Sequence, residues 1–295
     1  MSVDPYTPQS GDAAYSVREY RLKLRYRVAT NRLDGEAQIL AVAKEDLSSF
    51  HVDLVGLQAT KVRLDDEKRT PFKQGSRRLT ISPTQLLAAG QRFVLRVRYS
   101  GSPGPRNSPW GRIGWEELDD GMLVASQPTG APTWFPCNDR PADKARYHIE
   151  VTAEEGYAVV ATGDLTSRST ASGRTTWTYE EPIPTATYLA ALHVGRYRTA
   201  PLGLPGVPGD VHYPSDAHDP VMTDLAPPPR MFSNGCQRGR PGRVRDRRRS
   251  PSRANGLSQQ GRMTGRAPAS RLKFRPSHLA RGTFVVPLRG VKGWP

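Results

Sequence analysis

Cysteine is nearly absent from this sequence. Its 295 residues include two, Cys137 and Cys236. Two are too few for a disulfide framework, and they lack the C-x-x-C spacing of a zinc or redox motif. We therefore expect reduced thiols, as is usual in the cytoplasm.

Long apolar runs are missing as well. No stretch approaches the roughly 20 consecutive apolar residues that a membrane-spanning helix needs. The opening residues, MSVDPYTPQSGDAAYSV, are polar and contain no apolar core of a secretory signal. These features predict a cytoplasmic location and no membrane partner.

Helical periodicity is scarce. Only residues 83–90, PTQLLAAG, predict a helical turn or two, because proline stands at the start and glycine at the stop.

Alternation of apolar and charged residues is the main pattern. In residues 20–28 every second residue is apolar and the residues between them are Arg or Lys, which places all the cations on one face of a half-buried strand. The period of two recurs at residues 93–99, interleaved with Arg92, Arg96 and Arg98, and at residues 147–151, between His148, Glu150 and Thr152. Many short strands without helices between them predict an all-β domain, an antiparallel β-sandwich or curved sheet. Shorter strands are expected at residues 37–43, 52–57, 62–64, 79–81, 157–161, 175–179 and 187–194.

The net charge of +15 is distributed unevenly along the chain. Residues 230–295 contain 17 Lys and Arg and one acid, whereas residues 1–229 contain 26 basic and 27 acidic residues. The excess charge therefore belongs to the C-terminal part, and we interpret the first 229 residues as electrically neutral.

The stretch FPCNDRP, residues 135–141, is a stiff corner. Pro136 and Pro141 fix φ at two positions, and Asn138 and Asp139 are expected to form Asx-turns with nearby backbone N–H groups. Cys137 is expected to pack as a small hydrophobe. Taken alone, the segment predicts a rigid turn between two strands.

Together with its neighbours the corner carries a family resemblance. Residues 126–165, SQPTGAPTWFPCNDRPADKARYHIEVTAEEGYAVVATGDL, closely resemble the N-terminal β-domain of the aminopeptidase N family of zinc metallopeptidases. That family has an E/Q-P-T-x-A segment followed by F-P-C-x-D-x-P-x-x-K-A-x-[FY]. The expected strand at residues 20–28 and the stretch TYLAALHVGRY, residues 187–197, resemble the same domain. The resemblance therefore extends over roughly residues 5 to 230.

The resemblance implies two roles for this domain. It packs against a thermolysin-like catalytic domain, and one of its loops binds the free α-amine of a peptide N-terminus. The matching position is Gln127, whose neutral carboxamide should hold an ammonium group less strongly than a glutamate would. The alternative is that Gln127 caps a turn and touches no substrate.

The catalytic motif of that family is absent from this sequence. Hydrolysis there requires H-E-x-x-H, which places two histidines on one zinc ion, and no histidine pair here has that spacing. The six are His51, His148, His193, His212, His218 and His278. The Gly-Ala-Met-Glu-Asn motif, with which that family binds the substrate backbone, is missing too. We therefore expect no catalytic residues, no metal ligands and no bound zinc in this chain.

The C-terminal part differs in composition from the rest. We expect a flexible N-terminus at residues 1–15, the β-domain at 16–200, a linker toward a missing catalytic domain at 201–230 and a disordered Arg/Gly/Pro/Ser-rich tail at 231–295. Because these residue types have GC-rich codons, our hypothesis is that the tail is translated out of frame. A one-base shift near codon 231 should then restore H-E-x-x-H downstream.

The sequence thus favours a catalytically inactive, truncated member of the zinc aminopeptidase family. The alternative is a β-sandwich binding or scaffold module whose basic tail binds nucleic acid non-specifically. Specific nucleic-acid binding is not expected, because no recognition helix or aromatic platform accompanies the basic residues.

Overall fold

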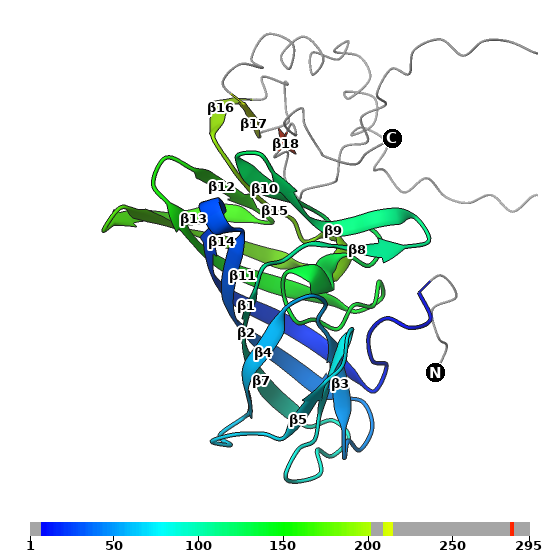
Figure 1. Ribbon diagram of the computed structural model, residues 1–295. Helices are drawn as coiled ribbons and strands as arrows, with labels where there is room; N and C mark the ends of the chain where they lie inside the picture. Colours follow the sequence, from blue (N-terminus) through cyan, green and yellow to red (C-terminus); the bar gives the residue numbers. More distant parts are fainter. Residues whose placement is uncertain (1–6, 202–208, 215–283, 286–295) are drawn as a thin grey trace, which may run out of the picture. The chain divides into compact units, whose positions relative to one another are not determined.

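A computed structural model describes residues 7–201 and 209–214, together with the backbone of residues 284 and 285. All of them belong to one compact unit. They fold into β-strands joined by turns and three short 3-10 segments (Figure 1). The prediction of an all-β fold is confirmed. No helix in this part of the chain has the length and apolar character needed to cross a membrane.

The largest sheet has seven strands in the order β13-β14-β11-β1-β2-β7-β4. The expected antiparallel pairing holds for all its neighbouring pairs except β1 and β11, which run parallel. A parallel pair needs a long connection, and here residues 28–143 provide it. The strands are β1 (Tyr15–Arg27), β2 (Arg32–Ala43), β4 (Gln58–Leu64), β7 (Arg92–Gly101), β11 (Lys144–Glu154), β13 (Asp164–Ala171) and β14 (Arg174–Ala186).

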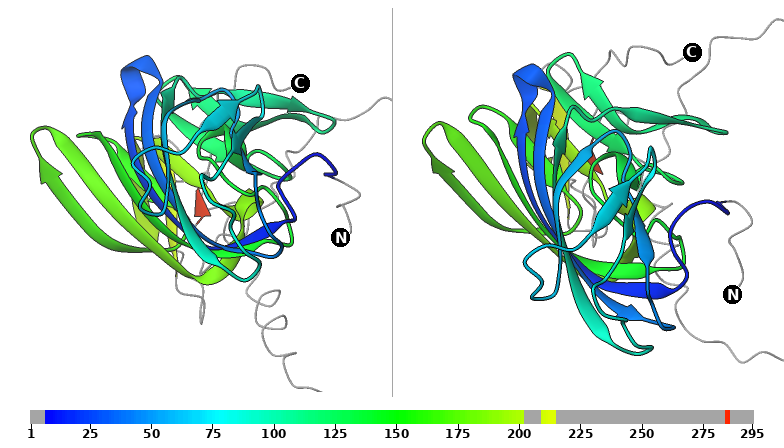
Figure 2. Two further views of the ribbon diagram at one scale, coloured as in Figure 1. Left: turned by 90° about the horizontal axis from the view of Figure 1, so that it is seen from below. Right: turned by 60° about the horizontal axis from the view of Figure 1, so that its bottom comes forward.

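Three smaller sheets accompany the large one (Figures 1 and 2). The first has the order β12-β15-β10-β9-β8, the second β3-β6-β5 and the third β16-β17-β18. Their strands are β3 (Phe50–Asp53), β5 (Phe72–Gln74), β6 (Arg78–Ile81), β8 (Pro105–Ser108), β9 (Gly111–Leu118), β10 (Gly121–Ala125), β12 (Ala158–Ala161), β15 (Leu192–Gly195), β16 (Tyr197–Pro201), β17 (Asp210–Pro214) and β18 (Phe284–Val285). The 3-10 segments are η1 (Val28–Thr30), η2 (Ala131–Thr133) and η3 (Thr187–Leu189).

One continuous core joins the large sheet to the two sheets that contain β3 and β10. The period of two in β1 decides which face is buried, because Tyr20 and Leu22 point inward while Arg21 and Lys23 remain exposed. Tyr20 stacks on Tyr147 of β11 with ring centroids 5.3 Å apart. Burial of each large apolar side chain contributes roughly 1.5–3 kcal/mol, so this alternation is the main source of the sheet's stability.

The helical prediction at residues 83–90 is wrong. Leu87 instead forms an isolated β-bridge with Leu47, in which the two residues exchange N–H···O bonds of 2.8 and 3.1 Å. A helix of two turns is marginal without tertiary support. The pairing with Leu47 supplies hydrogen bonds that the isolated segment lacks, and the extended form is therefore favoured.

In two of the expected strands less than half of the run is strand. The run at 187–194 begins with η3, and β15 starts only at Leu192. The run at 52–57 ends as a strand at Asp53, whose backbone also forms a bridge with Cys137 of the corner.

The two ends of the chain are described only in part. Residues 7–14, within the expected flexible N-terminus, make hydrogen bonds to β3 and to the corner, for example from Gly11 N to Asp53 Oδ2 at 2.6 Å. Of the expected basic tail, residues 231–283 and 286–295 lie outside the described residues, and the backbone of Phe284–Val285 pairs with β17.

Candidate functional site

The loop that follows β10 contains the predicted site residue, Gln127. It turns sharply, since Gly130 N donates to Ser126 O at 2.6 Å. The loop then enters η2. Thr133 closes the turn, because its Oγ1 donates to Gly130 O at 2.7 Å.

Strands β8 and β9 hold this loop in place. The backbone N–H of Trp115 donates to Thr133 Oγ1 at 2.9 Å, and the Arg106 guanidinium donates to Thr129 O at 3.2 Å. Gly130 lies so close to β9 that an added Cβ would meet the Cα of Gly114 at 2.7 Å. The backbone around Gln127 is therefore fixed by its neighbours.

The side chain of Gln127 is exposed, whereas Ser126 and Thr129 beside it are buried. Within the described ranges no residue hydrogen-bonds to its carboxamide. The amide oxygen can accept from a cationic donor and the amide nitrogen can donate to a carbonyl. A neutral, outward-facing carboxamide on a rigid loop is suited to binding a polar ligand.

The corner at residues 135–141 lies inside the core beyond this loop. Phe135 and Cys137 are fully buried. The backbone N–H of Asn138 donates to the hydroxyl of Tyr20 on β1 at 3.0 Å. The prediction that Cys137 packs as a small hydrophobe is confirmed. The expected turn between two strands instead connects η2 to β11.

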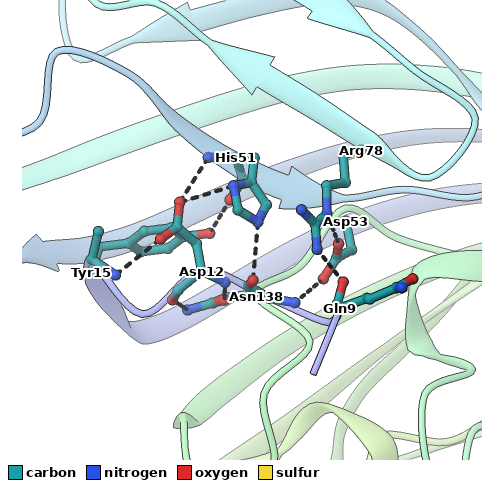
Figure 3. A network of polar contacts seen from close by, with 9 residues as sticks. Gln9, Asp12, Tyr15, His51, Asp53, Arg78 and Asn138 are labelled. Atoms are coloured by element: carbon teal, nitrogen blue, oxygen red, sulfur yellow. Dashed lines mark hydrogen bonds and ion pairs between the residues drawn. The ribbon is translucent and has the colours of Figure 1, made fainter. Parts of the chain in front are cut away.

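The Asx-turns expected at this corner are not formed. Asn138 Oδ1 accepts from the backbone N–H of Asp12 at 2.7 Å, and its Nδ2 donates to Asp12 O at 3.1 Å (Figure 3). The same Nδ2 donates to Asp143 Oδ2 at 2.7 Å. The amide therefore joins the N-terminal segment to the start of β11. Sequence reasoning missed this role because the partners are up to 126 positions away.

A histidine and a second aspartate extend the network (Figure 3). His51 contacts Asp12 at 3.1 Å, and this hydrogen bond raises the pKa of His51. Asp53 accepts from Gly11 and pairs with Arg78 at 3.4 Å. Every charged group in the network thus has a partner, which is typical of a structural cluster.

Asp139 is a fully buried acid whose pKa is strongly shifted. Its Oδ1 accepts from Thr187 Oγ1 at 2.7 Å, while its Oδ2 is buried without a hydrogen-bond partner among the described residues. Burial raises the pKa of Asp139 to about 7, and the nearby carboxylate of Asp53 adds to the shift. Near neutral pH this carboxyl is therefore partly protonated inside the core.

The described residues do not fit a zinc site. They contain no group of three or more His, Cys, Asp or Glu side chains placed to hold a metal ion. His51 is paired with Asp12 and His148 with Glu180, so each pair offers only two possible metal ligands. Burial lowers the pKa of His193 to about 4. His212 lies in β17, and His218 and His278 lie outside the described residues.

Comparison with known proteins identifies the domain. The family model of the peptidase M1 N-terminal domain matches residues 16–189. This chain belongs to the peptidase M1 family. The match covers the whole corner, the loop that contains Gln127 and the seven-stranded sheet, which agrees with the resemblance seen in the sequence.

Relatives and solved structures agree with this assignment. Leucyl aminopeptidase from Saccharolobus solfataricus is 24% identical over 183 residues, which are 61% of this chain and 22% of that protein. The M1 zinc metallopeptidase from Deinococcus radiodurans has a TM-score of 0.65 at 28% identity, over 73% of this chain and 51% of that one. A mutant of a two-domain M1 zinc metallopeptidase bound to L-arginine has a TM-score of 0.66 at 28% identity and the same coverage. The chain thus spans about half of these M1 structures and about a fifth of the relative.

Proposed function

We propose that this M1 domain supplies the amine-binding side of an aminopeptidase site and that Gln127 accepts hydrogen bonds from the α-ammonium group of a peptide N-terminus. The observation that supports this role is the exposed carboxamide at the matching family position, on a loop held by β8 and β9. Because the loop is rigid, little ordering entropy is lost when a ligand binds.

Hydrolysis requires a partner that this sequence does not provide. The family motif H-E-x-x-H does not occur in the 295 residues, and the described residues offer no substitute. The proposed partner is therefore an M1 catalytic domain that contributes the zinc ion and its activated water. By itself the chain is proposed to be catalytically inactive and to bind no zinc stoichiometrically.

An assay of the full chain tests its inactivity. We expect no turnover of aminoacyl-anilide substrates with or without added zinc, and no stoichiometric zinc after dialysis. Turnover that copurifies with the chain and depends on zinc would contradict the proposal.

A mixing experiment tests the role of Gln127. The full chain is combined with a separately produced M1 catalytic domain, and KM and kcat are measured for an aminoacyl-anilide. We expect Gln127→Ala to raise KM by roughly tenfold, since a hydrogen bond to a charged group is lost, and Gln127→Glu to lower it. Gln85→Ala, at another exposed glutamine, is the matched control. Equal KM values for Gln127→Ala and the control would rule out the proposed contact.

Two further expectations remain proposals. The free, buried thiol of Cys137 suits a cytoplasmic protein. The basic residues 230–295 are proposed to bind nucleic acid only non-specifically, through charge. A salt titration checks the second point, because purely electrostatic binding falls steeply with ionic strength.

A further inference from the structure

The outward face of one half of the large sheet is strongly cationic. Within their bounds, β1, β2, β4 and β7 contain eleven Lys and Arg and three Asp and Glu, a net charge of +8. Residues 1–229 sum to −1, so the rest of that region carries −9. The neutral total therefore conceals a separation of charge. The cations are Arg18, Arg21, Lys23, Arg25, Arg27, Arg32, Lys61, Arg63, Arg92, Arg96 and Arg98.

Strand register concentrates four of these cations at β4 and β7. Lys61 lies directly opposite Arg98, and Arg63 lies directly opposite Arg96. Like charges at directly opposed positions destabilise a sheet. Because two adjacent pairs of this kind do not stabilise the sheet, they indicate that these cations have another role, such as binding an anion.

The four cations and Glu36 of β2 line one hollow on this face. Arg98 forms an ion pair with Glu36, Nε to Oε2, at 2.8 Å. Arg96 donates to the backbone oxygen of Asp65 at 3.0 Å, and the Asp65 carboxylate is occupied by the backbone N–H of Val94 at 2.7 Å. Within the described part of the chain, Lys61 and Arg63 have no anionic partner.

We propose that this hollow binds a compact anion with two linked phosphoryl groups. Four cations and one carboxylate leave a charge of +3, which a pyrophosphate-type anion offsets and a single carboxylate does not. Guanidinium groups also match phosphate oxygens in geometry. This site lies on different strands from the Gln127 loop and does not depend on the proposed function.

A compact anion fits this face better than a long polyanion does. On β2, Asp34 and Glu36 stand between the cations of β1 and those of β7, since Glu36 is opposite both Lys23 and Arg98. These acids interrupt the positive surface that an extended phosphate backbone would follow. The lining also contains no aromatic side chain on which bases could stack.

Thermal unfolding of the full chain with sodium pyrophosphate tests the proposal. Tryptophan fluorescence reports on the described domain, because Trp115, Trp134 and Trp177 are buried in it. We expect a saturable rise in Tm, of roughly 5–10 °C when pyrophosphate reaches about 100 times its Kd. Arg63→Gln should weaken binding roughly tenfold or more while leaving the ligand-free Tm equal or higher, because a like-charge pair is removed.

The controls separate this hollow from the general positive charge. Arg18→Gln removes an exposed cation of β1 outside the hollow and should leave the pyrophosphate shift unchanged; Lys61→Gln is the second test variant. All three variants keep residues 230–295, so any binding of pyrophosphate to those residues is the same in the variants and the wild type. The proposal is overturned by equal shifts in wild type, Arg63→Gln and Lys61→Gln, or by no shift at about 10 mM pyrophosphate. A shift that depends on Arg63 with duplex DNA or polyglutamate but not with pyrophosphate also overturns it.

Discussion

Asp53 and Cys137 form an antiparallel backbone bridge. Asp53 N donates to Cys137 O at 2.8 Å, and Cys137 N donates to Asp53 O at 3.0 Å. The bridge joins the end of β3 to the stiff corner and encloses the Cys137 side chain in the core. Burial raises the pKa of this thiol well above its ordinary value, so it remains protonated and unreactive. The corner is therefore structural, and it fixes the chain between the Gln127 loop and β11.

Replacing Asn138 with alanine should destabilise the domain strongly. Its carboxamide makes three hydrogen bonds, to the backbone of Asp12 and to the carboxylate of Asp143. Their loss leaves buried polar groups unpaired, which costs about 2–4 kcal/mol. Urea denaturation followed by tryptophan fluorescence measures this change.

Asn107→Ala is the control for that measurement. Asn107 is exposed on β8, and its replacement should alter the free energy of unfolding by less than about 0.5 kcal/mol. If Asn138→Ala is as mild as this control, the network of Figure 3 does not hold the N-terminal segment in place.

The strands could be predicted from the sequence because their signal is local. From Tyr20 to Tyr26 of β1 each inward residue is two positions from the next, so the buried face can be recognised without any partner. The parallel register of β1 with β11 has no such signal, since Glu19 pairs with Arg146 across the whole intervening chain. The helical prediction for residues 83–90 was wrong for the same reason, because Leu87 forms a bridge with Leu47, a partner that the local sequence does not indicate.

The candidate site was predicted only in part. Gln127 was found through the family resemblance, and nothing in its own residue type or spacing distinguishes it. The roles of Asn138 and Asp139 were missed because an Asx-turn is the local expectation for these residues, whereas their actual partners are distant. The cationic hollow was missed because the net charge of a region does not show where its charged side chains lie. Only the strand register brings Arg63 opposite Arg96.

Asp139 should make the domain less stable as the pH rises from about 4 to 7. Its pKa is about 7 in the fold and near 3.9 in an unfolded chain. In this window the folded state binds a proton that the unfolded state has lost. Its contribution is therefore complete below about pH 4, declines up to about pH 7 and stays lost above it. Urea denaturation at intervals of pH measures this slope.

Asp139→Asn isolates this contribution. Asparagine cannot titrate, so the difference in unfolding free energy between wild type and variant should change by a few kcal/mol between about pH 4 and pH 7 and be constant above pH 8. Other groups with shifted pKa values, such as His51 and His193, contribute equally to both proteins. Parallel profiles over the whole range would show that Asp139 does not titrate in this window.

Replacing Gly130 with alanine should distort the loop that holds Gln127. An added Cβ would lie 2.7 Å from the Cα and N of Gly114 and from the Cα of Ser126. All three atoms belong to the backbone, so no side chain can rotate away, and overpacking of this kind costs about 1–3 kcal/mol. The loop and β9 must separate, which moves the Gln127 carboxamide as well.

Gly104→Ala is the matched control, because no atom lies within 4 Å of its added Cβ. Urea denaturation should show a loss for Gly130→Ala alone, and in the mixing experiment KM should rise for this variant although Gln127 itself is intact. An unchanged KM together with the expected loss of stability would mean that the position of the carboxamide does not control substrate binding.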